Sequence, residues 1–155
     1  MSAEPTTVTT SERSNLRRAL FVFLILAALV AGYLSYLKIA SADAVCIESG
    51  PFDCGLVLNS VYSEIGGIPI AYLGFIVDII LIGFLLVERR WLDQQIAVIL
   101  YFGLALFAFL FSVYLVYLQA AVIQAYCPWC LTHEALVTLY FIGGGVRLWR
   151  VLQAE

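Results

Sequence analysis

The chain has 155 residues, of which 63% are hydrophobic and only 12% are charged. In a soluble domain about a quarter of all residues are charged, because its surface is in contact with water. The composition therefore excludes an ordinary soluble globule and indicates an integral membrane protein. The sequence has no phosphate-binding, nucleotide-binding or nucleic-acid-binding motif, so no nucleic acid partner is expected.

Four long apolar segments occupy most of the chain. Each is long enough to cross a hydrocarbon layer of about 30 Å at a rise of about 1.5 Å per residue. We expect an all-α membrane protein, with a disordered cytoplasmic tail over residues 1–15 and a single four-transmembrane-helix bundle over residues 16–155. The segments are Leu16–Ala40, Pro69–Val87, Gln94–Gln124 and Leu131–Val151.

The first segment has an alternative interpretation as a cleaved signal peptide, because Ala40-Ser41-Ala42 has the small residues of a cleavage site. Its apolar run, Ala19–Leu37, is longer than the roughly 7–15 residues of a signal core. Lys38 also separates this run from the cleavage site. We therefore expect an uncleaved first helix.

Basic residues fall almost entirely on one side of the expected bundle. Of the eight, only Lys38 lies on the other side. The positive-inside rule then places both termini in the cytoplasm and the connecting segments 41–68 and 124–129 outside. All four cysteines would share this extracytoplasmic face of the cell membrane, where disulfides persist. The basic residues on the cytoplasmic side are Arg13, Arg17, Arg18, Arg89, Arg90, Arg147 and Arg150.

The first outer segment, residues 41–68, is long and acidic. Asp53 is expected to be the N-cap of a short helix, Asp53–Ser63, and Gly66-Gly67 predicts a turn before Pro69 opens the second span. We expect this segment to pack as a lid over the outer mouth of the bundle. Its carboxylates are Asp43, Glu48, Asp53 and Glu64, and the residues expected to face the bundle are Leu56, Val57, Val61 and Ile65.

Cys127-Pro128-Trp129-Cys130 has the spacing of thioredoxin-type redox sites and of half a zinc site. Pro128 in a first helical turn would leave unpaired N–H groups facing the cysteines, which stabilises a thiolate. A zinc site needs a second closely spaced pair, whereas Cys46 and Cys54 are eight residues apart. That spacing suits a loop disulfide, which could exchange with the helix pair.

Structural disulfides and a metal site remain alternatives to redox chemistry. A disulfide between Cys127 and Cys130 would close almost no loop and would add little stability, which weakens the structural interpretation. The residues therefore favour a redox function and predict no metal. A thiol relay within a membrane needs a terminal acceptor, and a lipid-soluble quinone can enter between helices.

These residues together resemble the vitamin K epoxide reductase family, in particular its prokaryotic quinone-reducing members. The similarity covers nearly all of the chain from Leu16 onward. It rests on the step from Cys46 to Cys54, Ser60, Gly67-Ile68-Pro69-Ile70-Ala71 with Gly74, the pair Cys127 and Cys130, and Gly32-Tyr33-Leu34-Ser35-Tyr36-Leu37.

The resemblance implies a role for each cysteine and for Ser60. Cys46 would meet an external thiol, Cys54 would exchange with Cys127, and Cys130 would reduce the quinone. Ser60 would help to hold the loop helix over the quinone pocket. The implied function is thiol:quinone oxidoreduction with a separate thioredoxin-like extracytoplasmic protein, which supports disulfide formation in exported proteins. The alternative is a non-enzymatic four-span protein with structural loop disulfides.

The resemblance also implies a quinone pocket beside the second and fourth segments. Human-type enzymes carry asparagine at the position of Ile70 and tyrosine at that of Glu134, and both contact vitamin K. Their absence favours a plain quinone, menaquinone or ubiquinone, over an epoxide. The implied pocket residues are Ile70, Leu73, Val77, Asp78 and Glu134.

Three polar residues near this pocket have two interpretations each. Asp78 is a costly intramembrane carboxylate, so we expect a hydrogen-bonded partner, with Ser112 or Tyr114 as candidates. His133 and Glu134 lie within one turn of Cys130 and could donate a proton or tune the thiolate. An interfacial polar pair at a helix start is the alternative for these two residues.

Overall fold

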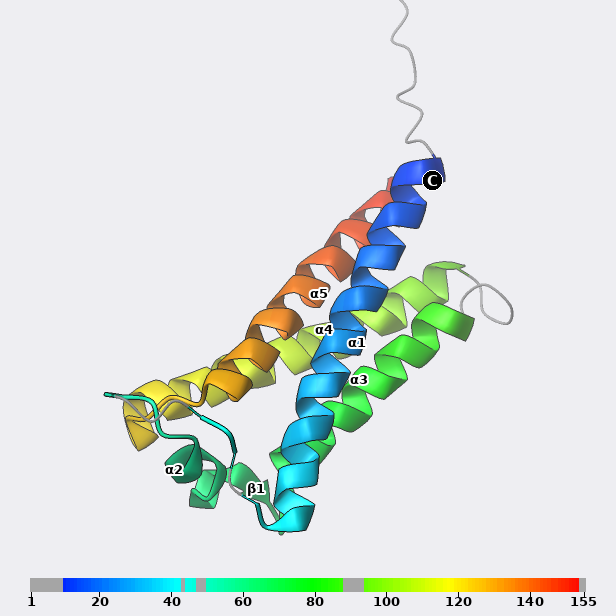
Figure 1. The fold of residues 1–155 in the computed structure, drawn as a ribbon. Helices are drawn as coiled ribbons and strands as arrows, with labels where there is room; N and C mark the ends of the chain where they lie inside the picture. The colour runs from blue at the N-terminus through cyan, green and yellow to red at the C-terminus, as the bar shows by residue number, and fades with distance from the viewer. Residues whose placement is uncertain (1–9, 43, 47–49, 88–93, 154–155) are drawn as a thin grey trace, which may run out of the picture.

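Four long helices form the body of the protein, and short elements gather at one end (Figure 1). The computed structural model describes residues 10–42, 44–46, 50–87 and 94–153, and the side chains from residue 14 onward. The long helices are α1 (Thr10–Ala40), α3 (Ile70–Val87), α4 (Gln94–Tyr117) and α5 (Pro128–Leu152). All four are long and apolar enough to cross a membrane, which confirms the expected fold class.

The helix ends differ from those expected at the starts of α1 and α3 and in the last turns of α4. α1 begins at Thr10 rather than Leu16, and α3 begins at Ile70 rather than Pro69. α5 begins at Pro128, as predicted from its place in a first helical turn, because Cys127 is extended (φ −103°, ψ 112°) and acts as the N-cap. α4 continues into the π-helical turn η2 (Leu118–Ile123), which ends where Gln124 adopts a left-handed conformation (φ 55°).

The helices pack unevenly around α1 and α5. α1 packs along both α3 and α5, and α5 also packs along α4, whereas α3 and α4 meet over a shorter stretch. Gly143 and Gly144 permit close approach, because a Cβ there would lie 2.5 Å from Leu20 Cδ2 and 2.8 Å from Tyr101 Cε1, respectively. The buried core comprises Leu20, Leu24, Ala27, Ala28, Leu81, Ile82, Leu85, Tyr101, Ala105, Val137 and Tyr140.

The outer segment contains a shorter helix than expected. Asp53 is the N-cap, as predicted, and its Oδ1 accepts a hydrogen bond from the Leu56 N–H at 2.8 Å. The helix α2 (Cys54–Leu58) ends well before Ser63, however, because Ser60 is extended (φ −64°, ψ 155°). A separate 3-10 turn, η1 (Val61–Ser63), follows it.

The break at Ser60 changes which side chains face the bundle. Val57 is buried, as expected, but Leu56 is 51% exposed and Val61 is 85% exposed. Ile65 is half exposed, although it lines the space between the outer segment and the long helices. The prediction that all four face the bundle is therefore wrong, because it assumed one uninterrupted helical period.

A two-residue hairpin joins the outer segment to α3. Strand β1 (Glu64–Ile65) pairs antiparallel with β2 (Ile68–Pro69), so Pro69 lies just before the second span. Gly66 and Gly67 form the predicted turn with φ values of 60° and 82°, which suit glycine. Lys38 fixes the hairpin to the end of α1, because its Nζ lies 3.3 Å from Glu64 Oε1.

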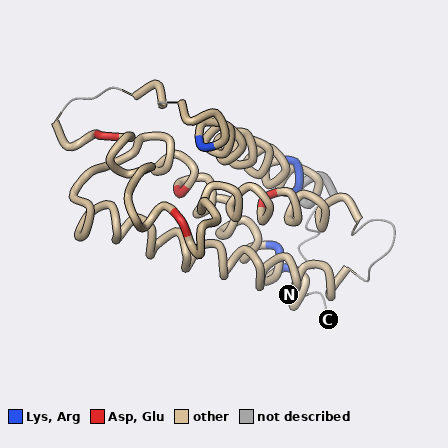
Figure 2. The backbone as a smooth tube through the Cα atoms, turned by 90° about the horizontal axis from the view of Figure 1, so that it is seen from below, with Lys and Arg blue, Asp and Glu red and all other residues tan. Residues whose placement is uncertain are grey.

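The arginines of the described part of the chain gather at the opposite end of the bundle. Arg17, Arg18, Arg147 and Arg150 line one depression near the start of α1 and the end of α5. Figure 2 shows where basic and acidic positions fall along the backbone. The side chain of Arg13 and the residues Arg89, Arg90, Asp43 and Glu48, which entered the topology and loop predictions, lie outside the described residues. The orientation in the membrane stays a prediction.

Candidate redox site

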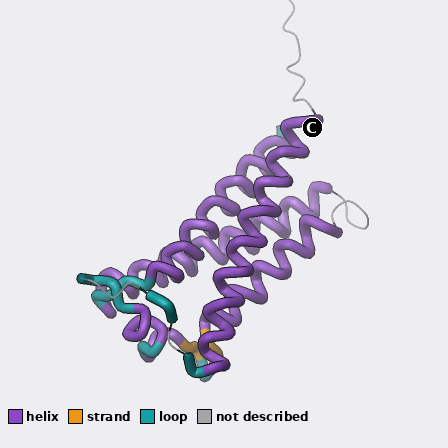
Figure 3. Tube along the Cα trace, viewed as in Figure 1, coloured by secondary structure: helices purple, strands orange, loops and turns teal. Residues whose placement is uncertain are grey.

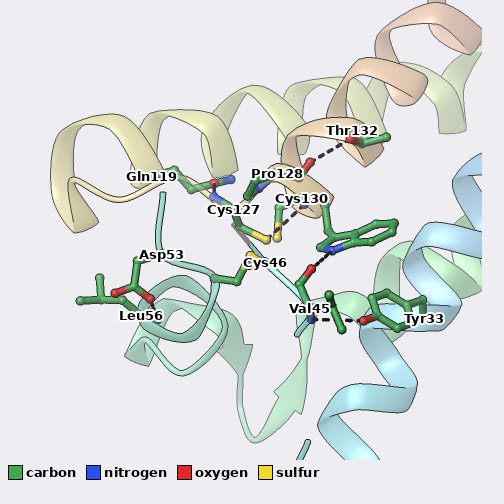
Figure 4. The surroundings of a disulfide bond; sticks show 12 residues. Tyr33, Val45, Cys46, Asp53, Leu56, Gln119, Cys127, Pro128, Cys130 and Thr132 are labelled. Atoms are coloured by element: carbon green, nitrogen blue, oxygen red, sulfur yellow. Dashed lines mark hydrogen bonds between the residues drawn. A yellow bond between two sulfur atoms is a disulfide. The ribbon is translucent and has the colours of Figure 1, made fainter. Parts of the chain in front are cut away.

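Backbone pairing joins the outer segment to the turn before α5. Phe52 and Tyr126 form a parallel bridge, in which the Asp53 N–H donates to Tyr126 O (3.1 Å) and the Tyr126 N–H donates to Pro51 O (2.9 Å). Cys54 follows Asp53 in the chain, and Cys127 follows Tyr126. The pairing therefore brings one cysteine from each pair into one cluster. The cluster belongs to the end of the molecule where the loops gather (Figure 3), and Figure 4 shows its surroundings with Cys46, Cys127 and Cys130 labelled.

The four cysteines form one group. Cys46 and Cys54 form a disulfide, with Cα atoms 6.2 Å apart, whereas Cys127 and Cys130 are thiols. Cys54 and Cys127 are buried in one apolar cluster, and Cys46 and Cys130 pack against it. Within the described residues, no three or more His, Cys, Asp or Glu side chains gather as a metal site would require.

The N-terminus of α5 stabilises the thiolate of Cys127. Cys127 Sγ accepts a hydrogen bond from the Cys130 N–H at 3.3 Å. The hydrogen bond from the Cys130 side chain lowers the pKa of Cys127 most. Burial opposes this effect, while the backbone N–H groups of Cys130 and Trp129 lower the pKa further. Cys127 is thus the more nucleophilic thiol position that a relay needs.

Gln119 supports Cys127 and was missed by sequence reasoning. Its Oε1 accepts a hydrogen bond from the Cys127 N–H at 2.9 Å, and its carbonyl accepts one from the Ala125 N–H at 3.2 Å. The π-helical turn η2 aims this side chain, as π-turns often do at functional sites. The only signal in the sequence is one amide near the end of an apolar span.

Trp129 connects α5 to the loop segment that carries Cys46. Its Nε1–H donates to Val45 O at 3.0 Å, and its ring lies 4.9 Å from that of Tyr33 of α1. The Val45 N–H in turn donates to the Tyr33 hydroxyl at 3.4 Å. Figure 4 shows these contacts on one side of the sulfur atoms. Both cysteine pairs are thereby held to the same two helices.

A cavity of about 390 Å³ lies behind Cys130, where α3 and α4 diverge. Its walls come from the outer segment and all four long helices. Ser60 lines it and donates its hydroxyl proton to Val57 O at 2.9 Å, which joins the end of α2 to the cavity wall. All five residues expected in the pocket line this cavity: Ile70, Leu73, Val77, Asp78 and Glu134.

Polar side chains meet on the inner wall of this cavity. Asp78 is fully buried and contacts His133 Nε2 through Oδ2 at 3.1 Å, and the Tyr140 hydroxyl donates to its Oδ1 at 3.4 Å. The expected partners are wrong, because Ser112 donates its proton to Glu134 instead and Tyr114 is 49% exposed. α5 rather than α4 therefore supplies the partners of Asp78.

Comparison with known proteins agrees with this geometry. A segment of 44 residues is 46% identical to the thiol-disulfide oxidoreductase LTO1 of Arabidopsis thaliana, and this segment covers 28% of the chain and 11% of that relative. The family model described as the vitamin K epoxide reductase family matches residues 8–143, from the start of α1 to within α5. The chain therefore belongs to the vitamin K epoxide reductase family.

Proposed function

We propose that this protein is a membrane thiol:quinone oxidoreductase of the prokaryotic, quinone-reducing type within its family. The observation that carries the proposal is the pairing of residues 51–53 with Tyr126, which brings a loop disulfide beside a helix-capping thiol. Cys130, the second thiol of the helix pair, lines the cavity. The arrangement gives electrons a route from an external thiol to a site inside the membrane.

Thiol–disulfide exchange accounts for the outer half of this route. An external thiolate attacks Cys46, one S–S bond forms as the Cys46–Cys54 bond breaks, and Cys54 leaves as a thiolate. The second external thiol then completes reduction of the loop pair. Cys54 next attacks Cys127 of an oxidised Cys127–Cys130 pair and releases Cys130 beside the cavity. Cys46 displaces Cys127 from Cys54, so that the loop disulfide re-forms and both helix thiols are reduced.

The cavity fits a quinone ring. Its volume of about 390 Å³ lies within the range of roughly 300–1,000 Å³ for small-molecule sites. Leu73 and Val77 supply apolar walls, and Glu134 and His133 offer polar groups at one end. A bound quinone supplies an acceptor for two electrons and two protons. Menaquinone and ubiquinone both satisfy this chemistry.

The outer segment forms part of the wall of this cavity. Val57, Leu58 and Ile65 contribute apolar lining, and Ser60 ties the end of α2 to them. We place this face outside the cytoplasm, with both termini inside, from the distribution of arginines. A separate thioredoxin-like protein would then deliver thiols to Cys46, and the reaction would support disulfide formation in exported proteins.

Quinone consumption by the purified protein tests this function. The protein in nanodiscs receives dithiothreitol and a short-tailed ubiquinone or menaquinone analogue, and quinol formation is followed by absorbance. Cys130→Ala should abolish turnover, because no second thiol remains beside the cavity. Thr132→Val, an exposed change on the same turn of α5, should turn over normally. A protein whose loops are merely held by disulfides would show no turnover in any form.

A further inference from the structure

A buried imidazole lies between two carboxylates beside the cavity. His133 Nε2 is 3.1 Å from Asp78 Oδ2, and His133 Nδ1 is 4.0 Å from Glu134 Oε1. We propose that His133 is a catalytic proton donor to the quinone, that Nδ1–H is the donating group, and that Asp78 is its positioning residue. This assignment rests on the proposed function and extends it to the protons.

Two acidic side chains face the ring of His133. Asp78 of α3 is 1% exposed at its side chain, and Glu134 of α5 is 9% exposed. Two carboxylates with so little access to water stabilise a cation between them. The neutral groups around them are the hydroxyls of Tyr140, which donates to Asp78, and of Ser112, which donates to Glu134.

The two nitrogens of the ring have different tasks. Nε2 is held by Asp78 within hydrogen-bond distance, whereas the 4.0 Å from Nδ1 to Glu134 is too long for a hydrogen bond. The N–H at Nδ1 faces Glu134 without closing a hydrogen bond at that distance, and both side chains line the cavity, so a bound quinone could accept from Nδ1. Gly74 leaves room for the ring, since a Cβ there would lie 3.4 Å from His133 Cε1.

Proton balance requires a donor other than the cysteines. Conversion of the helix pair to a disulfide releases two electrons, but with Cys127 as a thiolate the pair carries one proton, on Cys130. The quinone must receive two protons. If His133 gives the second, the thiolate and the imidazolium disappear together, so the net charge of the buried site stays constant. The step therefore adds no net charge to a site that lies within the membrane.

His133 is the basic side chain of the described cavity wall that lies beside Cys130. Among the described lining residues, the other basic side chain is Lys38, which is paired with Glu64 at the outer mouth. His133 lies one helical turn after Cys130 on α5. It regains its proton when the next external dithiol reduces the helix pair, because that dithiol brings two protons and Cys127 keeps none.

Nitrogen NMR of the quinone-free protein gives a readout independent of turnover. The chain has one histidine, so ¹⁵N-histidine labelling with a histidine-free affinity tag yields one ring to assign. We expect imidazolium shifts at neutral pH in the wild type. Asp78→Asn, which keeps the shape of the side chain, should yield a neutral ring. A neutral ring in the wild type would overturn the proposal.

Kinetics of His133→Gln then tests the donor role. We expect kcat to fall by about 10²-fold with little change in KM, the usual size of a general-acid effect. Reduction of Cys46–Cys54 by dithiothreitol should proceed at the wild-type rate, because that exchange does not involve the ring. Thr132→Val is the matched control on the neighbouring residue.

The outcomes separate this proposal from the proposed function. Wild-type protein without quinone turnover would refute the function itself. Wild-type turnover with His133→Gln within twofold of it would overturn only the proton-donor role. If His133→Gln fails to fold, the ring charge in wild type and Asp78→Asn still decides, because a ring that stays neutral or ignores Asp78 contradicts the assignment.

Discussion

The two cysteine pairs of this protein sit on different kinds of backbone. Cys46 and Cys54 bracket a loop and form a disulfide whose first cysteine is partly exposed. Cys127 and Cys130 lie on the first turn of a long helix, where Pro128, Gln119 and backbone N–H groups fix their geometry. One pair can be reached from outside, and the other reaches the cavity.

This difference shows how backbone context assigns a chemical task to the same side chain. The start of the long helix α5 supplies hydrogen bonds that stabilise the Cys127 thiolate. Cys46 lies in a loop, and Cys54 opens the five-residue helix α2 as half of a disulfide. In the proposed relay, exchange between the pairs would depend on the short stretch where residues 51–53 pair with Tyr126. Substitutions at the pairs and at this junction should therefore have graded effects.

Cys127→Ser should have the largest effect, because it removes the helix thiol that meets the loop pair and leaves Cys46, Cys54 and Cys130 in place. Cys54 would have no disulfide to attack, so turnover with dithiothreitol and quinone should fall by about 10³-fold or more. The loop pair should accumulate in its reduced form. Alkylation followed by mass spectrometry measures the redox state of Cys46 and Cys54 during turnover. Reoxidation of the loop pair at the wild-type rate would mean that it reduces the quinone directly.

The lowered pKa of Cys127 predicts an intermediate effect that depends on pH. A lowered pKa keeps the thiolate present at pH values where an ordinary cysteine is protonated, and the thiolate is lost only as pH falls through that lower value. Cys130→Ala removes the hydrogen bond that is the largest cause of the lowered pKa of Cys127, so the pH midpoint of thiolate formation should rise. Cys130→Ser keeps a donor and should preserve more of the lowering.

Ultraviolet absorbance of the thiolate measures the pH midpoint of Cys127 in both variants. With Cys46 and Cys54 in a disulfide, Cys127 is the one thiol left in each variant. Equal midpoints in the alanine and serine variants would show that the backbone N–H groups, rather than the Cys130 side chain, set the thiolate chemistry.

The sequence predicted the helices and the cysteine pairs well, for a physical reason. Crossing a membrane requires long apolar segments, which composition reveals directly. The N-cap at Asp53 and the Gly66-Gly67 turn were also predicted correctly, since both depend on local backbone chemistry. These features need no knowledge of which helices meet.

Contacts between elements could not be predicted in the same way. The spans are apolar on nearly all faces, so no amphipathic pattern indicates which faces pack together. The pairing of Asp78 with His133 and Tyr140 therefore could not be told from a pairing with Ser112. The π-helical turn that aims Gln119 likewise depends on a local insertion that composition does not reveal.

Trp129→Phe should have the smallest effect and tests the junction between the pairs. Phenylalanine keeps a ring beside Tyr33 but loses the hydrogen bond from Nε1 to Val45 O at 3.0 Å. We expect a loss of about 1 kcal/mol in unfolding free energy. Amide hydrogen exchange should quicken in residues 44–46, and electron transfer between the pairs should slow a few-fold.

Trp149→Phe is the matched control for this change. Trp149 is 66% exposed near the other end of α5, where its ring is far along the helix from both cysteine pairs. The Trp149→Phe substitution should leave amide hydrogen exchange at residues 44–46 unchanged. If both substitutions alter exchange equally, the effect reflects general loosening of α5. If only Trp129→Phe quickens amide exchange, the hydrogen bond between the indole and Val45 holds the loop disulfide beside Cys127. Thiol–disulfide exchange between the two pairs should then slow in this variant alone.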